Sequence, residues 1–245
     1  MCIECLFCYG GFLMIYKLKH ITKYFTKNEL ILWCSSMIAI TVSFLIFDRE
    51  NFLTLFASFI GVTSLILNAK GNPFGQLLMV IFSILYGVIS FSFSYYGEMI
   101  TYLGMTAPMA VFSLISWLRN PYGDNKSEVK INRINLKETI FMALLTVLVT
   151  FIFYHILSAF DTSYLPLSTL SVATSFLSVY LTYKRSIFFA ICYAANDVVL
   201  IILWTLATIS DISYLSVVIC FAMFLINDIY GFVNWSKMQK HQEKG

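Results

Sequence analysis

Long runs of apolar residues, separated by short polar stretches, make up most of this chain. A membrane-spanning helix needs about 20 mostly apolar residues, and eight runs approach or exceed that length. The strands of a membrane barrel would be about 10 residues long and would alternate between apolar and polar positions, which these runs do not. We therefore expect an all-α polytopic membrane protein with eight transmembrane helices, over residues 30–47, 52–68, 75–96, 100–118, 139–160, 164–182, 187–209 and 212–235.

The composition supports a membrane protein. Hydrophobic residues make up 59% of the chain, charged residues only 12%, and the mean hydropathy is +0.80. A soluble domain carries about 25% charged residues, so this chain could not cover a surface that faces water. We therefore exclude a water-soluble enzyme and a nucleic-acid-binding protein, and we expect the lipid bilayer as a partner. We find no motif for a catalytic site, a metal or a cofactor, and we expect none of the three.

Positively charged residues are concentrated on one side of the predicted membrane. Of the 16 Lys and Arg residues, only Arg49 lies in a connection on the other side. Because cytoplasmic segments are enriched in Lys and Arg, we expect both termini in the cytoplasm. The segments outside the spans are then a cytoplasmic lead-in over 1–29, a cytoplasmic loop over 119–138 and a cytoplasmic tail over 236–245. Met14 is an alternative start to Met1, because it opens a basic lead-in.

The predicted helices form two similar triplets, over residues 52–118 and 164–235. Each starts with a short uncharged helix, turns through a Lys-bearing connection and ends on a Trp that a basic residue soon follows. Three crossings invert the chain, so the triplets share an orientation only if one helix lies between them, and the linker helix over 139–160 meets that need. We predict an extra N-terminal helix over 30–47 and a 3+1+3 core of parallel repeats, with a site between the two bundles. Chance similarity among apolar helices is the alternative.

Two aspartates lie inside predicted spans. Each follows an asparagine, as Asn196-Asp197 and Asn227-Asp228, and no Lys or Arg lies inside any predicted span. A charged residue near mid-membrane costs at least about 2.5–3.5 kcal/mol, so a functional role is the first hypothesis. Without a basic partner, these aspartates would bind a proton, a metal ion or a positively charged substrate, and an anionic solute is disfavoured. Aspartates that only tie helices together are the alternative.

Aromatic residues near these pairs suit a flat or cationic ligand, through stacking and cation–π contacts. Phe189 and Tyr193 precede Asn196, and Trp204 follows it. Gln76 and Tyr86, in the span 75–96, are placed for a cavity between the bundles. The candidate substrate-binding residues are therefore Asn196, Asn227, Asp197, Asp228, Phe189, Tyr193, Trp204, Gln76 and Tyr86.

Four further residues carry structural expectations. Trp117 and Trp235 end their triplets near the cytoplasmic surface, and we expect them in the interfacial aromatic belt. Pro108 should kink its helix. His155 is a lone histidine in the linker helix, and we expect a hydrogen-bonded structural residue.

The second triplet resembles the PnuC family of nicotinamide riboside transporters. The resemblance rests on the stretch from Lys184-Arg185 through Cys192-Tyr193-Ala194-Ala195-Asn196-Asp197 to Trp204, and on Asn227-Asp228 followed by Tyr230-Gly231-Phe232 and Trp235. It extends over about residues 51–242. It implies a fold similar to SWEET sugar transporters, a homotrimer and a place in the bacterial cytoplasmic (inner) membrane.

One motif implied by the resemblance is only partly kept. The family pattern Trp-x-x-Trp-x-x-x-Asn falls here on Phe189, Cys192 and Asn196, so the asparagine is present and both tryptophans are replaced. Phe189 can still stack on a ring, and Tyr193 can compensate for Cys192. The resemblance implies uptake of nicotinamide riboside by facilitated diffusion through alternating access, as a uniporter. The alternatives are a related carrier for another cationic vitamin such as thiamine, and a proton-coupled carrier for a small solute.

Overall fold

The computed structural model describes residues 24–92 and 95–244. The alternative start at Met14 and most of the lead-in over 1–29 lie outside the described residues. The chain divides into two units, residues 1–35 and 36–245, and each is described by itself.

The described part of the first unit contains the start of helix α2 (Lys27–Phe47). The Thr26 hydroxyl accepts a hydrogen bond from the Glu29 backbone N–H at 3.3 Å, and the Glu29 carboxylate accepts one from the Thr26 N–H at 2.7 Å. This reciprocal pair is a capping box, which satisfies two backbone donors at the helix end. It places the start of the helix three residues before the predicted 30.

The described residues contain eight helical segments long and apolar enough to cross a membrane, as the sequence predicts. The fourth combines α5, the π-helical segment η1 and α6, and the last combines the 3₁₀ turn η2 with α10. With α2, they are α3 (Phe52–Ala69), α4 (Pro73–Ser92), α5 (Tyr96–Thr101), η1 (Tyr102–Thr106), α6 (Ala107–Leu118), α7 (Leu136–Ala159), α8 (Leu165–Tyr183), α9 (Phe189–Ala207), η2 (Ile212–Tyr214) and α10 (Leu215–Gln242).

The last helix, α10, ends seven residues beyond the predicted 235, and the boundary between the third and fourth spans lies four residues earlier than predicted. α4 ends at Ser92, whereas α5 already begins at Tyr96, so Glu98 lies in the first turn of a spanning helix and not in a connection. Just before Pro108 the helix widens to a π-turn, in which the Ala107 N–H donates to the Tyr102 carbonyl. Proline has no N–H to donate, and a π-bulge is a usual way to absorb such a break.

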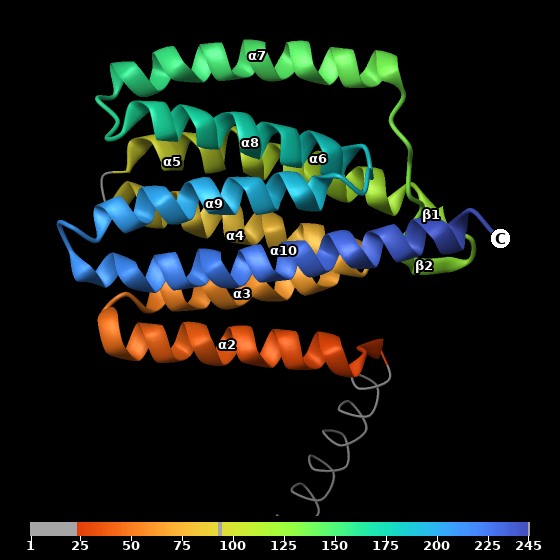
Figure 1. Ribbon diagram of the computed structural model, residues 1–245, viewed down its shortest axis with the longest axis horizontal. Coiled ribbons are helices and arrows are strands. Elements are labelled where there is room, and N and C mark those ends of the chain that lie inside the picture. The colour runs from red at the N-terminus through yellow and green to blue at the C-terminus, as the bar shows by residue number, and fades with distance from the viewer. Residues whose placement is uncertain (1–23, 93–94, 245) are drawn as a thin grey trace, which may run out of the picture. The chain divides into compact units, whose positions relative to one another are not determined.

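The helices of the second unit are arranged in the same order in both triplets. α4 packs against α3 and α6, and α9 packs against α8 and α10 (Figure 1). The last helix of each triplet packs against the first helix of the other, α6 on α8 and α10 on α3. Both bundles therefore face each other along their length.

The linker helix α7 contacts α8 and lies at the edge of the bundle (Figure 1). Most of its apolar side chains are exposed, as a lipid-facing helix requires. His155 is exposed on this helix, and its described contacts are with the rings of Phe151 and Tyr154. The expectation that His155 is hydrogen-bonded is therefore wrong.

The connection between the triplets contains a short hairpin that the sequence did not predict. β1 (Pro121–Tyr122) pairs antiparallel with β2 (Asn125–Val129). β2 ends on the turn between α3 and α4, where the Val129 N–H donates to the Gly71 carbonyl at 3.0 Å. Gly71 has a φ of +66°, which glycine adopts without strain.

Candidate functional site

A small cavity lies between the two triplets, with walls from six elements. The side chains that line it are Leu65 of α3, Met79 and Phe82 of α4, Tyr102 and Thr106 of η1, Ser175 of α8, Tyr193, Asn196 and Asp197 of α9, and Phe221, Phe224 and Asp228 of α10. Its volume is about 30 Å³, enough for one or two water molecules. A larger ligand therefore requires these side chains to move apart.

Asn196 presents its amide to this cavity in a fixed orientation. Its side-chain oxygen accepts hydrogen bonds from the hydroxyls of Thr174, at 2.8 Å, and Ser175, at 3.0 Å, both on α8. The side chain is buried, with 3% exposure. Because the oxygen is held by two donors, the amide N–H groups are the part of the side chain that can donate to a ligand.

Asp197 on α9 and Asp228 on the neighbouring α10 both line the cavity, and their carboxyl groups interact with each other. Both side chains are buried, and one Asp197 carboxyl oxygen has no hydrogen-bond partner. Two ionised carboxylates in contact repel each other strongly, and a proton or a cation between them removes the repulsion. No Lys or Arg side chain lines this cavity in the described part of the chain. The pair is therefore suited to a positively charged ligand.

Aromatic rings form the rest of the wall. The Phe82 ring lies 5.5 Å from Phe224 and 6.1 Å from Tyr102, and Phe221 lies 5.6 Å from Phe224, measured between ring centroids. Tyr86 packs behind this wall, with its ring 4.4 Å from Tyr102. Such rings offer stacking and cation–π contacts to a flat cation.

The nine candidate residues fall into three groups. Asn196, Asp197, Asp228 and Tyr193 line the cavity. Tyr86 and Trp204 lie outside it, toward the ends of α4 and α9. The remaining three turn elsewhere: Asn227 donates to the Ser36 hydroxyl, Gln76 donates to the Asn68 amide oxygen, and Phe189 packs against Trp235.

The sequence pattern held a signal for residues that were missed. Phe221 and Phe224 were not among the candidates, although they lie seven and four residues before the candidate Asp228 and so share its face of α10. Asn227 is one residue earlier, about 100° around the helix, and points toward Ser36. Tyr102 was missed because nothing in the sequence marks the π-helical turn that carries it.

One end of the bundle is closed by a pair of tryptophans. At this end, where α3, α6 and α8 finish, the connections carry Lys70, Arg119, Lys184 and Arg185; we call it the basic end, and the other the opposite end. Trp117 and Trp235 are fully buried there, with ring centroids 5.3 Å apart. The expectation that they form an interfacial belt is therefore wrong.

Each of these tryptophans bonds to the other triplet. The Trp117 indole N–H donates to the Thr182 carbonyl at the end of α8, at 2.9 Å, and the Trp235 indole N–H donates to the Asn68 carbonyl at the end of α3, at 2.7 Å. The Phe189 ring packs edge-on against Trp235 at 4.7 Å. The basic end of the cavity is thus covered by two equivalent contacts.

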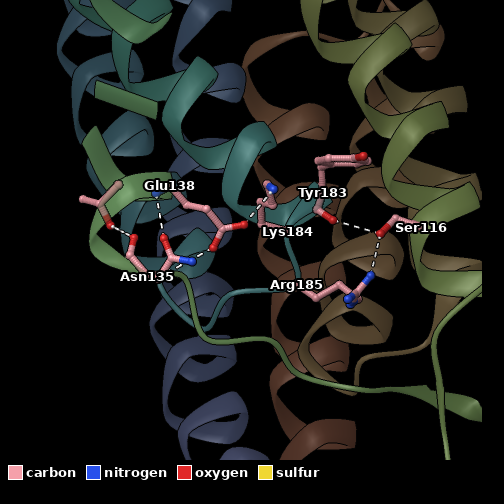
Figure 2. A network of polar contacts seen from close by, with 7 residues as sticks. Ser116, Asn135, Glu138, Tyr183, Lys184 and Arg185 are labelled. Atoms are coloured by element: carbon pink, nitrogen blue, oxygen red, sulfur yellow. Dashed lines mark hydrogen bonds and ion pairs between the residues drawn. The ribbon is translucent and has the colours of Figure 1, made fainter. Parts of the chain in front are cut away.

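A polar network lies at the same end of the bundle, at the ends of α6 and α8 (Figure 2). The Arg185 guanidinium donates to the Ser116 hydroxyl at 2.9 Å, and that hydroxyl donates to the Tyr183 carbonyl at 2.9 Å. Lys184 forms an ion pair with Glu138 at 3.0 Å. The hydrogen bond to Glu138 raises the pKa of Lys184. These contacts join the ends of α6 and α8 to the start of α7.

The comparisons with known proteins agree with this architecture. The sequence profile of a family described as nicotinamide mononucleotide transporter matches residues 51–237. A nicotinamide riboside transporter PnuC from Neisseria mucosa is 22% identical over 212 residues, covering 85% of this chain and 81% of that protein. A nicotinamide riboside transporter PnuC from Haemophilus influenzae is 20% identical over 214 residues, covering 86% of this chain and 90% of that protein.

A solved structure shows the same fold. The crystal structure of the vitamin B3 transporter PnuC superposes with a TM-score of 0.77 and 22% sequence identity, covering 89% of this chain and 94% of that one. The resemblance drawn from the second triplet is thereby confirmed. Because the family profile spans most of its length, this multi-pass membrane protein belongs to the nicotinamide mononucleotide transporter family.

Proposed function

We propose that this chain carries nicotinamide riboside across the bacterial cytoplasmic membrane by facilitated diffusion. The observation that carries the proposal is the contact between Asp197 and Asp228 in an aromatic cavity between the two helix triplets. Nicotinamide riboside combines a flat ring, a single positive charge on that ring and a hydroxylated sugar. The names of the relatives from Neisseria mucosa and Haemophilus influenzae support the same substrate.

Each part of this substrate has a partner on the wall. The charged ring stacks on Phe82, Phe224 or Tyr102, with its positive charge toward the two aspartates. The ribose hydroxyls accept hydrogen bonds from the Asn196 amide. Of the other candidates from the sequence, Asn227, Gln76 and Phe189 act on helix packing and on the closure of the basic end.

The charge of the wall favours the riboside over the mononucleotide. A phosphate group would bring two negative charges next to Asp197 and Asp228, and in the described residues no Lys or Arg lines the cavity to bind it. Proteins usually recognise phosphate with Arg, Lys or a helix N-terminus. We therefore expect the phosphorylated molecule to be rejected.

Transport requires that the cavity open to each side in turn. We propose that the basic end faces the cytoplasm, with both termini there, because Lys and Arg are enriched in cytoplasmic segments. One triplet rocks against the other, and the closure by Trp117 and Trp235 opens when the substrate leaves. No covalent step is needed. The family resemblance implies a homotrimer, which analytical ultracentrifugation of the purified protein would test.

Calorimetric titration of the purified protein tests the proposed substrate. We expect nicotinamide riboside to bind, and nicotinamide mononucleotide to bind at least tenfold more weakly. Tighter binding of the mononucleotide would refute the argument from charge. Binding of thiamine in preference to the riboside would keep the cationic site and change the vitamin.

A further inference from the structure

A third buried carboxylate lies next to the cavity, toward the opposite end. Glu98, in the first turn of α5, is only 3% exposed. It is four residues before Tyr102, a cavity residue, so it lies on the same helix face about 6 Å farther out. The predicted spans 75–96 and 100–118 leave Glu98 in a connection, whereas the structure places it inside the helix.

A second helix places Glu98 in the same layer. The Ser171 hydroxyl on α8 donates to the Glu98 carboxylate at 3.3 Å. Ser171 is four residues before Ser175, which lines the cavity. Both α5 and α8 run from the opposite end toward the basic end, so two independent helices put Glu98 one turn outside the cavity.

Two aromatic residues in the neighbourhood have polar atoms without partners. Tyr86 lies one turn beyond Phe82 on α4, and its ring lies 6.4 Å from that of Trp204. Both side chains are at most 5% exposed, and the Tyr86 hydroxyl and the Trp204 indole N–H lie close to each other. They do not reach hydrogen-bonding distance, and neither atom has another hydrogen-bond partner. We call Glu98, Tyr86 and Trp204 the outer layer.

The residues between the outer layer and the opposite end are also aromatic. The Trp204 ring lies 4.7 Å from that of Tyr95, and Tyr95 lies 5.9 Å from Tyr214. Burial, followed by the proximity of Tyr214, raises the pKa of Tyr95 to about 12. Its hydroxyl is therefore neutral at physiological pH, and it offers a hydrogen bond without adding charge.

The stability of the fold does not explain these features, because they lower it. A buried carboxylate without a cationic partner and buried polar atoms without hydrogen bonds both disfavour the folded state. In the described residues, Glu98 forms no ion pair. A polar cargo that passes through the layer would supply the missing partners for as long as it stays there.

We propose that the outer layer is a second recognition site for the cationic substrate, through which it passes between the medium and the central cavity. Glu98 attracts the positive charge, Tyr86 and Trp204 contact the ring, and their free donors bond to the polar groups of the cargo. The ligand class is a monovalent aromatic cation. This inference rests on the proposed function, since it assigns a second binding site to the same substrate.

The test compares Glu98→Gln with the wild type in two assays. Initial uptake of labelled nicotinamide riboside is measured in proteoliposomes at low concentration, and equilibrium binding is measured by calorimetry. We expect Glu98→Gln to lower uptake at least tenfold and to change the dissociation constant less than threefold, because the central cavity is intact. Glu50→Gln, an exposed glutamate at the same end, is the matched control and should keep uptake within twofold.

An uncharged analogue separates charge from packing. The reduced dihydronicotinamide riboside has nearly the same shape without the positive charge, so Glu98→Gln should change its uptake less than threefold. Equal losses for the charged and the neutral molecule, or uptake of the cation within threefold of wild type, would overturn the proposal. If Glu98→Gln does not fold, Glu98→Asp keeps the charge and should keep the preference for the cation; loss of that preference would also overturn it.

The outcomes also separate this inference from the proposed function. A wild-type protein that takes up thiamine but not nicotinamide riboside would refute the proposed substrate, and the Glu98 comparison would then be made with thiamine. A wild-type protein that takes up neither cation would end both proposals.

Discussion

Replacing Trp117 or Trp235 by Phe should loosen the basic end by similar amounts. Each loses one buried indole N–H···O bond, at 2.9 and 2.7 Å respectively. The acceptor carbonyls, of Thr182 and Asn68, keep a backbone N–H donor each, so neither is left unpaired and the loss is about 1 kcal/mol. The void left by the smaller ring adds about 1 kcal/mol. Each substitution should therefore shift the closed-to-open equilibrium by about 2 kcal/mol, or about 30-fold.

The two substitutions should not be fully independent. The rings of Trp117 and Trp235 lie 5.3 Å apart, and an aromatic pair contributes about 0.5–1.5 kcal/mol beyond its buried area. The first substitution already weakens this contact, so the second removes less. We expect the double variant to open about threefold less than the product of the two single effects.

Labelling of a cysteine on the cavity wall measures this opening. Ser175 is buried and lines the cavity, so Ser175→Cys, with the six native cysteines replaced by Ala, is a reporter of access. A membrane-impermeant maleimide is added to inside-out vesicles, in which the proposed cytoplasmic end faces the medium. If opening is fast and brief, the labelling rate is proportional to the population of the open state.

Trp204→Phe is the matched control. Trp204 is buried to the same degree but contacts Tyr95 and Tyr214 at the opposite end, so labelling from the basic end should stay within about threefold of the parent, or ~0.6 kcal/mol. Labelling that is unchanged in both Trp117→Phe and Trp235→Phe would refute the role of the pair. A large effect in one and none in the other would refute their equivalence.

Three further predictions concern single residues. Asn196→Ala should weaken binding of nicotinamide riboside by about 2–12-fold, because it removes one neutral hydrogen bond. Asn227→Ala should lower the melting temperature and leave the affinity nearly unchanged, because the Asn227 amide bonds to Ser36 and to its own helix. Equal losses of affinity in calorimetry would contradict this prediction. Gly75→Ala should lower the free energy of unfolding by about 1–3 kcal/mol through overpacking, because a Cβ there would lie 2.8 Å from a backbone nitrogen of α3. Gly231→Ala, whose Cβ would have its nearest atoms at 3.7 Å, should be neutral or stabilising. The reverse order of melting temperatures would contradict this description of the packing. The pKa of Lys184 is raised above its unfolded value of 10.5. Its contribution to the free energy of unfolding is therefore full below pH 10.5 and is lost as the pH rises through the higher folded pKa. The free energy of unfolding of the wild type should therefore exceed that of Lys184→Gln by a constant amount between pH 7 and 9. We expect this amount to be about 1 kcal/mol or less, because the pair lies at the surface with 26% and 30% of its side chains exposed. A difference that grows in this range would refute the assignment.

The positions of the spanning helices were predictable because they depend on local composition. A run of apolar residues must be helical to satisfy its backbone in lipid, and all eight spans are confirmed. The start of α5 was misplaced because Glu98 is polar, and only a tertiary contact, the hydrogen bond from Ser171, shows why it is tolerated inside. The hairpin of β1 and β2 was missed because its strands are too short to give an alternating pattern.

The candidate site was predictable in its chemistry and less so in its geometry. Asp197 and Asp228 stand out in the sequence because charge is so rare in the spans, and both line the cavity. Asn227 looked equivalent to Asn196, but the two asparagines face different neighbours, a hydroxyl of Ser36 and two hydroxyls of α8. Which face of a helix meets which neighbour depends on packing across the bundle, and sequence spacing alone does not supply that information.

The environment of Trp117 and Trp235 also could not be predicted from the sequence. A Trp beside basic residues at the end of a span is typical of the membrane interface, and the sequence offers no contrary signal for Trp117 or Trp235. Their burial follows from an exchange between the triplets, in which each indole bonds to the end of the first helix of the other triplet. Two such contacts at the same end give the protein a closure that both halves must release together. A carrier that opens by rocking one triplet against the other needs contacts that join the two triplets in this way. Contacts within one triplet alone would not break when the other triplet moves.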